Sequence, residues 1–244
     1  MYYLPVAFGV WLHVFFWGAG GAILIMPRPW RRCWPVLALA VGFALQSLVV
    51  WLGAYANLRG TDAYAGWTEA LPAALLLIAL LRRRSHVMAE LWSFRGLWSV
   101  MAANLVALVL PLALATRGLT TLSFGSCDAA DYAAGARVLK EFAHGDRTGF
   151  LGLTEVVHVA SVDNFFDFWL RLNHFTPSAL IAFNGTILDC SPSELTSVLT
   201  AVLLVGSLPV VFWLARAVLG YGPRVSLWVS AIYGLSPVAW YAVF

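Results

Sequence analysis

Charged residues are scarce in this chain of 244 residues, because Asp, Glu, Lys and Arg together make up only 11%. Soluble domains carry about 25% charged residues, so a water-exposed globular fold is excluded for most of the chain. The formal net charge is only +3, and the basic residues stand at the ends of apolar stretches. A nucleic-acid-binding surface needs Lys and Arg clustered on one face, so we expect no nucleic-acid partner.

Cysteine is also scarce. Cys33, Cys127 and Cys190 do not have the spacing of metal ligands, and we expect no metal site. Cys127 and Cys190 stand at opposite ends of one polar segment, so they either form a disulfide on an oxidising side or remain as two thiols. The N-terminus lacks the basic region and the cleavage site of a signal peptide, so we interpret its apolar stretch as a retained span.

Hydrophobic residues make up 61% of the chain. A helix needs about 20 apolar residues to cross about 30 Å of hydrocarbon, and six stretches meet or approach that length. We predict an all-α polytopic integral membrane protein with about six transmembrane helices and interfacial helices in one long loop. The predicted spans are Leu4–Met26, Trp34–Ala56, Ala70–Leu81 with some upstream residues, Leu97–Thr116, Ser193–Leu219 and Val225–Phe244. The third is short, so we expect it to thin the bilayer or to be extended by a snorkelling Arg82.

The arginines predict the orientation. They gather after the first span (Arg28, Arg31, Arg32), after the third (Arg82–Arg84, Arg95) and around the turn between the last two spans (Arg216, Arg224). If all three groups are cytoplasmic, the positive-inside rule is obeyed and Glu90 is the only acidic residue on that side. We therefore expect an extracytoplasmic N-terminus and an extracytoplasmic loop over 117–191, in a membrane interpreted as the bacterial inner membrane. The chain divides into a three-span region, 1–96, and a second region, 97–244.

The long loop contains several helix signals. Asp128 is predicted to cap a helix that stops near Gly145; Tyr132, Ala136, Leu139 and Phe142 form its apolar face, with Arg137, Lys140, Glu141 and His144 opposite. An aromatic interfacial helix is predicted over Ser161–Leu172. Thr176 is predicted to cap a helix with Pro177 at its first position, and this helix is too short to cross. The segment Ser191–Glu194 has the pattern of a capping box that opens the next span.

Polar residues and glycines inside the first two spans have packing interpretations. We favour hydrogen bonds between helices for His13 and Gln46 over a functional role, although intramembrane polar residues are functional candidates in general. Gly18, Gly20 and Gly21 are interpreted as sites of close helix approach.

The residues from Leu97 to Phe244 resemble a known family. A span is followed by Asp128-x-x-Asp131-Tyr132 and an Ala-rich helix, then an aromatic interfacial helix, His174-Phe-Thr-Pro177, and a long span ending in Ala215-Arg216. A further span carries Leu235-Ser236-Pro237. This order is similar to the N-terminal half of the GT-C superfamily of polyprenyl-phosphate-dependent glycosyltransferases, which includes lipid A aminoarabinose transferases and protein O-mannosyltransferases. Family members run to about twice this length, so we expect a missing C-terminal half or a partner chain.

The resemblance implies an inverting transferase of the cell envelope. Its donor substrate would be a polyprenyl-phosphate sugar, with no other cofactor, and membrane lipids would be its surroundings. The acidic residue of the family's first external loop corresponds to Asp128 or Asp131; Asp128 is our first choice as the base, and Asp131 would position the acceptor or tune Asp128. Arg171 and His174 would contact the lipid phosphate.

Less specific interpretations remain open for each residue. Asp128 serves equally as a helix cap, Asp131 as a dipole-complementing residue, Arg171 as the partner of Asp167 and His174 as a packing residue. A transporter or lipid-flipping protein is the alternative function, disfavoured because we expect no acidic residue at mid-span and find no repeated broken helices. A scaffold subunit is the third alternative.

Overall fold

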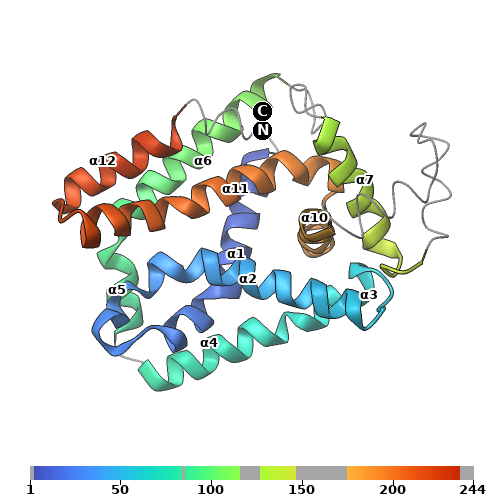
Figure 1. Ribbon diagram of the computed structural model, residues 1–244, viewed down its shortest axis with the longest axis horizontal. Coiled ribbons are helices and arrows are strands. Elements are labelled where there is room, and N and C mark those ends of the chain that lie inside the picture. The colour runs from blue at the N-terminus through green and yellow to red at the C-terminus, as the bar shows by residue number, and fades with distance from the viewer. Residues whose placement is uncertain (1–2, 84–85, 116–126, 147–174, 237–244) are drawn as a thin grey trace. The chain divides into compact units, whose positions relative to one another are not determined.

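The computed structural model describes residues 3–83, 86–115, 127–146 and 175–236, and for residues 115 and 127–130 the backbone only (Figure 1). Of the described residues 87% are helical, and none lies in a strand. The all-α prediction is therefore confirmed. The helices form two compact units, one of residues 1–45, 69–118 and 198–244 and the other of residues 46–68 and 119–197.

Membrane-spanning helices account for most of the described chain. Five helical stretches are long and apolar enough to cross a membrane: Tyr3–Ile25, Arg28–Tyr55, Thr61–Arg83, Arg95–Leu114 and Pro192–Val218. They correspond to the first five predicted spans, so the chain is a polytopic integral membrane protein. The sixth predicted span is described only to Ser236, and its described part forms α12 (Pro223–Gly234).

The third span is longer than the sequence estimate. Helices α3 (Thr61–Thr68) and α4 (Ala70–Arg83) follow each other with a single turn residue, Glu69, between them. Together they count 23 residues, which is about 34 Å at 1.5 Å per residue. The prediction of a short span is wrong because the polar residues of α3 were assigned to the loop outside it. Neither bilayer thinning nor snorkelling is needed to explain its length.

The first unit holds most of the spans. Its remaining elements are α1 (Tyr3–Ile25), the 3₁₀ helix η1 (Arg28–Cys33), the first part of α2 (Trp34–Tyr55), α5 (Val87–Ser93), α6 (Arg95–Ala115), most of α11 (Pro192–Trp213), the π-helix η4 (Leu214–Val218) and α12. Helix α1 packs against α4 and α6, and α12 lies beside α6 (Figure 1). Part of the unit's core is a buried cluster that includes Ala19, Ala22, Trp34 and Ala38.

Glycines allow the helices around α1 to approach at backbone distance. A Cβ atom on Gly18 would collide with the backbone of Ala38 and Gly42 in α2, and one on Gly20 would collide with the backbone of Leu76 in α4. Gly18 and Gly20 are two residues apart, about 200° around the helix, so α1 is held closely on two opposite faces. The predicted role of these glycines in close helix packing is confirmed.

The second unit is built around α10 (Phe175–Ile187), which packs against α7 (Cys127–Glu141) and α3 (Figure 1). Nearly all of α10 is buried, including the whole stretch 178–185. Its 13 residues span about 20 Å, short of the ~30 Å of hydrocarbon, in agreement with the prediction that this helix does not cross. The helix begins one residue before the predicted cap Thr176, within the usual variation of helix boundaries.

The start of α11 has the predicted capping box. The backbone N–H of Ser191 donates to Glu194 Oε2 at 3.0 Å, and the backbone N–H of Glu194 donates to Ser191 Oγ at 3.3 Å. Pro192 occupies the first helical position, where its missing N–H costs no hydrogen bond. These reciprocal bonds satisfy two backbone donors that the helix itself leaves unpaired.

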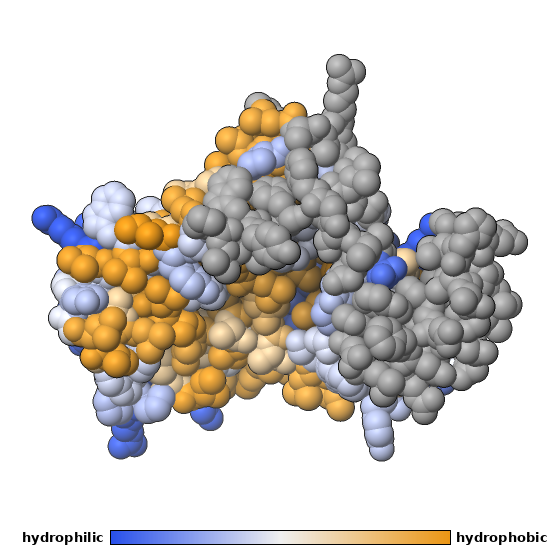
Figure 2. All heavy atoms as spheres, turned by 45° about the horizontal axis from the view of Figure 1, so that its top comes forward, coloured by the Kyte–Doolittle hydropathy of each residue, from blue (hydrophilic) through white to orange (hydrophobic). Residues whose placement is uncertain are grey.

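Large apolar side chains cover much of the outer surface. Leu114 and Trp228 are 78% and 69% exposed, and Leu77, Trp92 and Ile232 are exposed as well. Figure 2 shows hydrophobic residues spread over the coloured part of one face. Exposing such side chains to water costs free energy, whereas contact with lipid acyl chains does not, so these surfaces are suited to contact the bilayer core.

Candidate functional site

The two predicted carboxylates lie at the start of α7. Asp128 is its second residue and Asp131 its fifth, so the two positions are one turn apart on the same face of the helix. Asp131 is half-buried, and the side chain of Asp128 lies outside the described part of the chain. Since α7 begins at Cys127, Asp128 lies within the first turn, two residues beyond the capping position that was predicted for it. The pair is therefore joined by one rigid helical turn.

The two predicted phosphate ligands, Arg171 and His174, lie outside the described residues, as do the predicted helix Ser161–Leu172 and the side chain of Cys127. The next described residue is Phe175, the first residue of α10. Aromatic residues surround this end of α10. The indole N–H of Trp51 donates to Thr176 Oγ1 at 2.8 Å, and its ring lies edge-on to Phe175 with centroids 4.9 Å apart. The hydroxyl of Thr176 thus binds a neighbouring helix.

The prediction that His144 belongs to the polar face of this helix is wrong, because His144 lies beyond the end of α7 and is half-buried. Its ring packs edge-on against Phe175, with ring centroids 4.7 Å apart. The helical projection fails because α7 ends at Glu141, and the chain then turns so that the backbone N–H of Gly145 meets Asn57 Oδ1 at 3.4 Å. The predicted end of the helix at Gly145 was therefore four residues late. His144 lies beyond the opposite end of α7 from the acidic pair.

Hydrogen bonds tie the rest of α10 to its neighbours. Thr186 Oγ1 donates to Asp62 Oδ1 at 2.7 Å and lies 2.9 Å from Thr61 Oγ1, which joins the end of α10 to the start of α3. Asn184 Nδ2 donates to Gln46 Oε1 at 3.2 Å, so Gln46 makes the predicted hydrogen bond between helices. Asn184 is fully buried. The described part of this unit has a cavity of only about 10 Å³ beside α10, too small for a ligand.

A second polar cluster lies inside the first unit, in the middle of α1. His13 Nε2 is 2.9 Å from Glu69 Oε1, and the indole N–H of Trp17 is directed at both atoms, at 3.0 and 2.9 Å. His13, Trp17 and Gly20 follow the spacing i, i+4, i+7, so they form one stripe of α1 that faces α4. His13 therefore makes the predicted hydrogen bond between helices. Its partner contradicts the expectation that no acidic residue lies within a span.

The contact between His13 and Glu69 joins an imidazole and a carboxylate within the membrane-spanning helices. Its 2.9 Å separation is that of a hydrogen bond, and the imidazole tautomer decides which atom donates. Ionisable groups inside a span are costly and mark proton or ion sites in many membrane proteins. The sequence signal for this cluster was Glu69 itself, which lies among the residues just upstream of Ala70 that were counted with the third span, but its carboxylate was not considered as a partner.

Among the described residues, no group of three or more His, Cys, Asp or Glu side chains has the arrangement of a metal site. The chain matches no protein-family model, no curated protein and no solved structure. Functional inference therefore depends on the acidic pair of α7, the aromatic start of α10 and the cluster in α1.

Proposed function

We propose that this chain acts in a membrane glycosyltransferase that moves a sugar from a polyprenyl-phosphate carrier to an acceptor hydroxyl. The observation that carries the proposal is the acidic pair Asp128 and Asp131, one turn apart at the start of α7. Helix α7 stands in the polar segment that follows a membrane span, and it packs against α10, a buried helix too short to cross. Carboxylates in such a position can act on a headgroup while its lipid tail stays in the bilayer.

The proposed reaction is a single displacement. The acceptor oxygen attacks the anomeric carbon, the bond from that carbon to the phosphate oxygen breaks, and the electron pair leaves on the phosphate. Asp128 takes the acceptor proton, and Asp131 positions the acceptor or tunes Asp128. Attack from the face opposite to the phosphate inverts the anomeric carbon. Cationic donors then stabilise the departing phosphate.

The length of α7 constrains which residue contacts the reacting phosphate. Ten residues separate Asp131 from Glu141, about 15 Å along the axis, and Phe175 contacts His144 beyond that far end. Arg171 precedes Phe175 by four residues, which reach about 13 Å when extended. The proposal gives the phosphate contact to His174 and Arg171, and the fork geometry of Arg171 suits a bidentate contact.

The proposed location is the extracytoplasmic face of a bacterial inner membrane. Support comes from the arginines that follow α1, α4 and α11, which the positive-inside rule assigns to the cytoplasm. In a variant with Ser at all three cysteines, we expect Glu141→Cys to react with an impermeant maleimide in intact cells. Ala89→Cys, on α5, should react only after lysis. Both side chains are exposed, and the reverse pattern would contradict the proposed orientation.

The test of function is Asp128→Asn in the protein as the cell makes it. In the first turn of α7, Asn keeps the size of Asp and loses only a favourable interaction of the charge with the helix dipole, typically about 0.3–1 kcal/mol, whereas loss of a general base lowers the rate by about 10²–10⁴-fold. Cells lacking the protein, complemented with wild type or variant, are assayed by mass spectrometry for polyprenyl-phosphate sugars. We expect the sugar-loaded polyprenyl phosphate to accumulate in the deletion strain and in the Asn strain, and to disappear in the strain complemented with wild type.

The matched control is Glu141→Gln, which makes the same chemical change at the exposed far end of α7. It should restore the wild-type lipid pattern. Asp131→Asn is measured in the same assay to show how much each of the two carboxylates contributes to activity. Full complementation by both Asn variants, at wild-type protein levels, would remove the acidic pair from catalysis and the proposal with it.

The cluster around Glu69 favours a second candidate function, a transporter driven by protons. A protonatable pair at mid-span is a feature of proton-coupled carriers, and a glycosyltransferase active at the membrane surface does not need one. Glu69→Gln removes the proton site and keeps a hydrogen-bonding side chain. Loss of proton uptake into liposomes containing the purified protein, with normal carrier turnover, would support this second function. Unchanged proton flux would exclude it.

A further inference from the structure

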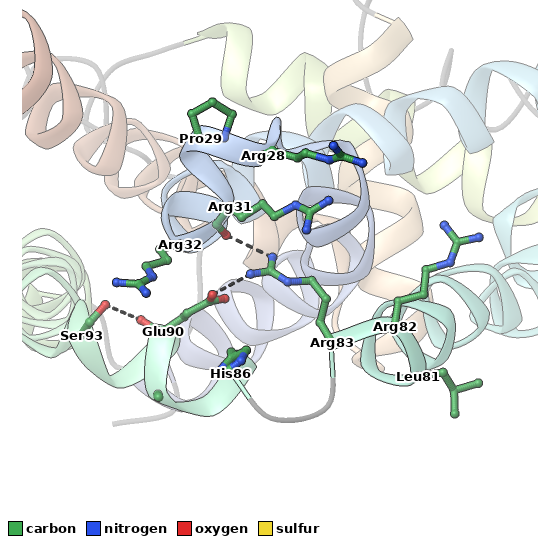
Figure 3. Close-up of a pocket in the computed structure, with 11 residues that line it drawn as sticks. Arg28, Pro29, Arg31, Arg32, Leu81, Arg82, Arg83, His86, Glu90 and Ser93 are labelled. Atoms are coloured by element: carbon green, nitrogen blue, oxygen red, sulfur yellow. Dashed lines mark hydrogen bonds and ion pairs between the residues drawn. The ribbon is translucent and has the colours of Figure 1, made fainter.

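The ends of η1, α4 and α5 enclose a basic cavity of about 880 Å³ in the first unit (Figure 3). Five arginines line it: Arg28, Arg31, Arg32, Arg82 and Arg83. One carboxylate, that of Glu90, lines it as well, so the formal charge of the lining is +4 with His86 neutral. Below, this cavity is called the basic pocket. It belongs to the side that the charge pattern assigns to the cytoplasm, so it is separate from the proposed catalytic loop.

One arginine of the basic pocket, Arg83, is bonded to other groups of the protein. Arg83 Nη2 donates to Glu90 Oε1 at 2.6 Å, and Arg83 Nη1 donates to the backbone carbonyl of Arg31 at 3.1 Å (Figure 3). The indole N–H of Trp34 donates to the other oxygen of Glu90 at 3.0 Å. These bonds join η1, α2, α4 and α5, so they form the rigid wall of the pocket.

Four arginines remain without a carboxylate partner in the described part of the chain: Arg28, Arg31, Arg32 and Arg82. All four are exposed, and they line one cavity from two elements, η1 and α4. The positive-inside rule accounts for arginines at this end of the spans, but it requires no shared cavity. Like charges held together repel each other, and an anion among them relieves that repulsion. Guanidinium groups bind phosphate oxygens in pairs, which makes phosphate the best-matched anion.

A largely apolar cavity adjoins the basic pocket at the end of α5. Ser93 lines the basic pocket and also a cavity of about 520 Å³ whose walls include Phe94, Leu97, Phe212 and Trp213. A phosphate in the basic pocket therefore lies beside a groove suited to hydrocarbon. Free phosphate would leave that groove unused, whereas the acyl chain of a lipid can occupy it.

We propose that the basic pocket binds the phosphate headgroup of an anionic phospholipid of the cytoplasmic leaflet, with an acyl chain in the adjoining groove next to Ser93. The phosphate is held by Arg28, Arg31 and Arg32 of η1 and by Arg82 of α4, in the wall fixed by the contact between Arg83 and Glu90. Basic pockets between spans are established sites for lipid phosphates in membrane proteins.

The test uses the purified full-length chain in neutral detergent and native mass spectrometry. Phosphatidylglycerol, phosphatidylcholine and inorganic phosphate are added separately at equal concentrations. We expect phosphatidylglycerol to bind at least about tenfold more tightly than phosphatidylcholine, because the choline group of the second lipid brings a further positive charge close to the arginines. Equal binding of the two lipids would overturn the proposal. Binding of inorganic phosphate as tight as that of phosphatidylglycerol would overturn the lipid assignment.

Variants identify the pocket as the binding site. The triple change Arg28→Lys, Arg31→Lys and Arg32→Lys keeps the charge and the orientation in the membrane but removes the fork geometry, and we expect about tenfold weaker binding of phosphatidylglycerol. The corresponding triple change to Gln should abolish the preference over phosphatidylcholine. Arg224→Lys, an exposed arginine outside the pocket, should bind like wild type. If the triple Lys variant also binds like wild type, the lipid lies elsewhere and the proposal fails.

Discussion

Two glutamates of the first unit, one in the middle of the membrane-spanning helices and one at their basic end, bind the same kind of donor. Glu69 accepts the indole N–H of Trp17 at 2.9 Å, and Glu90 accepts that of Trp34 at 3.0 Å. In both cases the tryptophan precedes the glutamate by more than 50 residues and lies on another helix. Each carboxylate therefore fastens two distant parts of the chain.

The basic partners of these two glutamates differ. Glu90 contacts Arg83 at 2.6 Å, and Glu69 contacts His13 at 2.9 Å. A guanidinium group stays protonated in proteins, so the first contact is a permanent ion pair. The imidazole of His13 also lies 3.0 Å from the indole nitrogen of Trp17, so the second contact is one part of a cluster of three side chains. Similar geometry thus gives an ion pair at the basic end of the spans and a hydrogen-bonded cluster at mid-span.

The largest expected effect comes from breaking the permanent pair. Glu90→Ala leaves Arg83 without its carboxylate and the indole of Trp34 without its acceptor, and removing one partner of a buried ion pair typically costs about 3–5 kcal/mol. We expect a matching fall in the unfolding free energy of the detergent-purified protein, measured by denaturant titration. Glu141→Gln, at an exposed carboxylate, should change it by less than about 0.5 kcal/mol. A loss for Glu90→Ala as small as this control would show that the pair does not fasten the helices.

An intermediate effect is expected where α1 and α2 touch. Gly18→Ala inserts a methyl group against the backbone of Ala38 and Gly42, which cannot move aside as a flexible side chain would. Such overpacking costs about 1–3 kcal/mol. The control is Gly66→Ala in α3, where the added Cβ has no neighbour within 4 Å, so the helix should gain up to about 1 kcal/mol. A lower melting temperature for Gly18→Ala and a higher one for Gly66→Ala would support the helix contact, and equal shifts in the two variants would contradict it.

The smallest expected effect is that of Glu69→Gln on stability. The amide oxygen still accepts from Trp17 and the amide N–H₂ can donate to His13, so only the difference between a charged and a neutral hydrogen bond is lost. We expect about 1 kcal/mol, measured by thermal unfolding in the same detergent. A loss as large as that of Glu90→Ala would mean that the mid-span carboxylate is also a permanent fastening, and the contrast between the two glutamates would disappear.

The spans and the helix start at Ser191 could be predicted from the sequence because their causes are local. Apolar length alone decides whether a helix can cross a bilayer, and a capping box is complete within four residues. The length of the third span was underestimated because its first residues are polar. Thr61, Asp62 and Thr68 are polar, yet Thr61 and Thr68 are buried and Asp62 binds Thr186 of α10.

The candidate site was less predictable because it depends on pairing between distant helices. Nothing around His13 indicates that a glutamate 56 residues later will contact it, and nothing around His144 indicates that Phe175 will cover it. In the sequence, the basic pocket appeared only as separate groups of arginines, and the positive-inside rule already explained those groups. The assignment of Asp128, Asp131, Arg171 and His174 still depends on the order of motifs along the chain.

The two glycine contacts of α1 also imply an order of assembly. A chain enters the membrane from its N-terminus, so the face of α1 at Gly18 meets α2 first, and the face at Gly20 waits for Leu76 of α4 to be synthesised. The 34 residues from Gly42 to Leu76 take about 2–7 s at 5–20 residues per second. During this interval His13 and Trp17 lack their carboxylate partner, and the newly made hairpin of α1 and α2 carries an unmatched polar stripe. The arrival of α4 then supplies the carboxylate and closes the second face of α1 in one step.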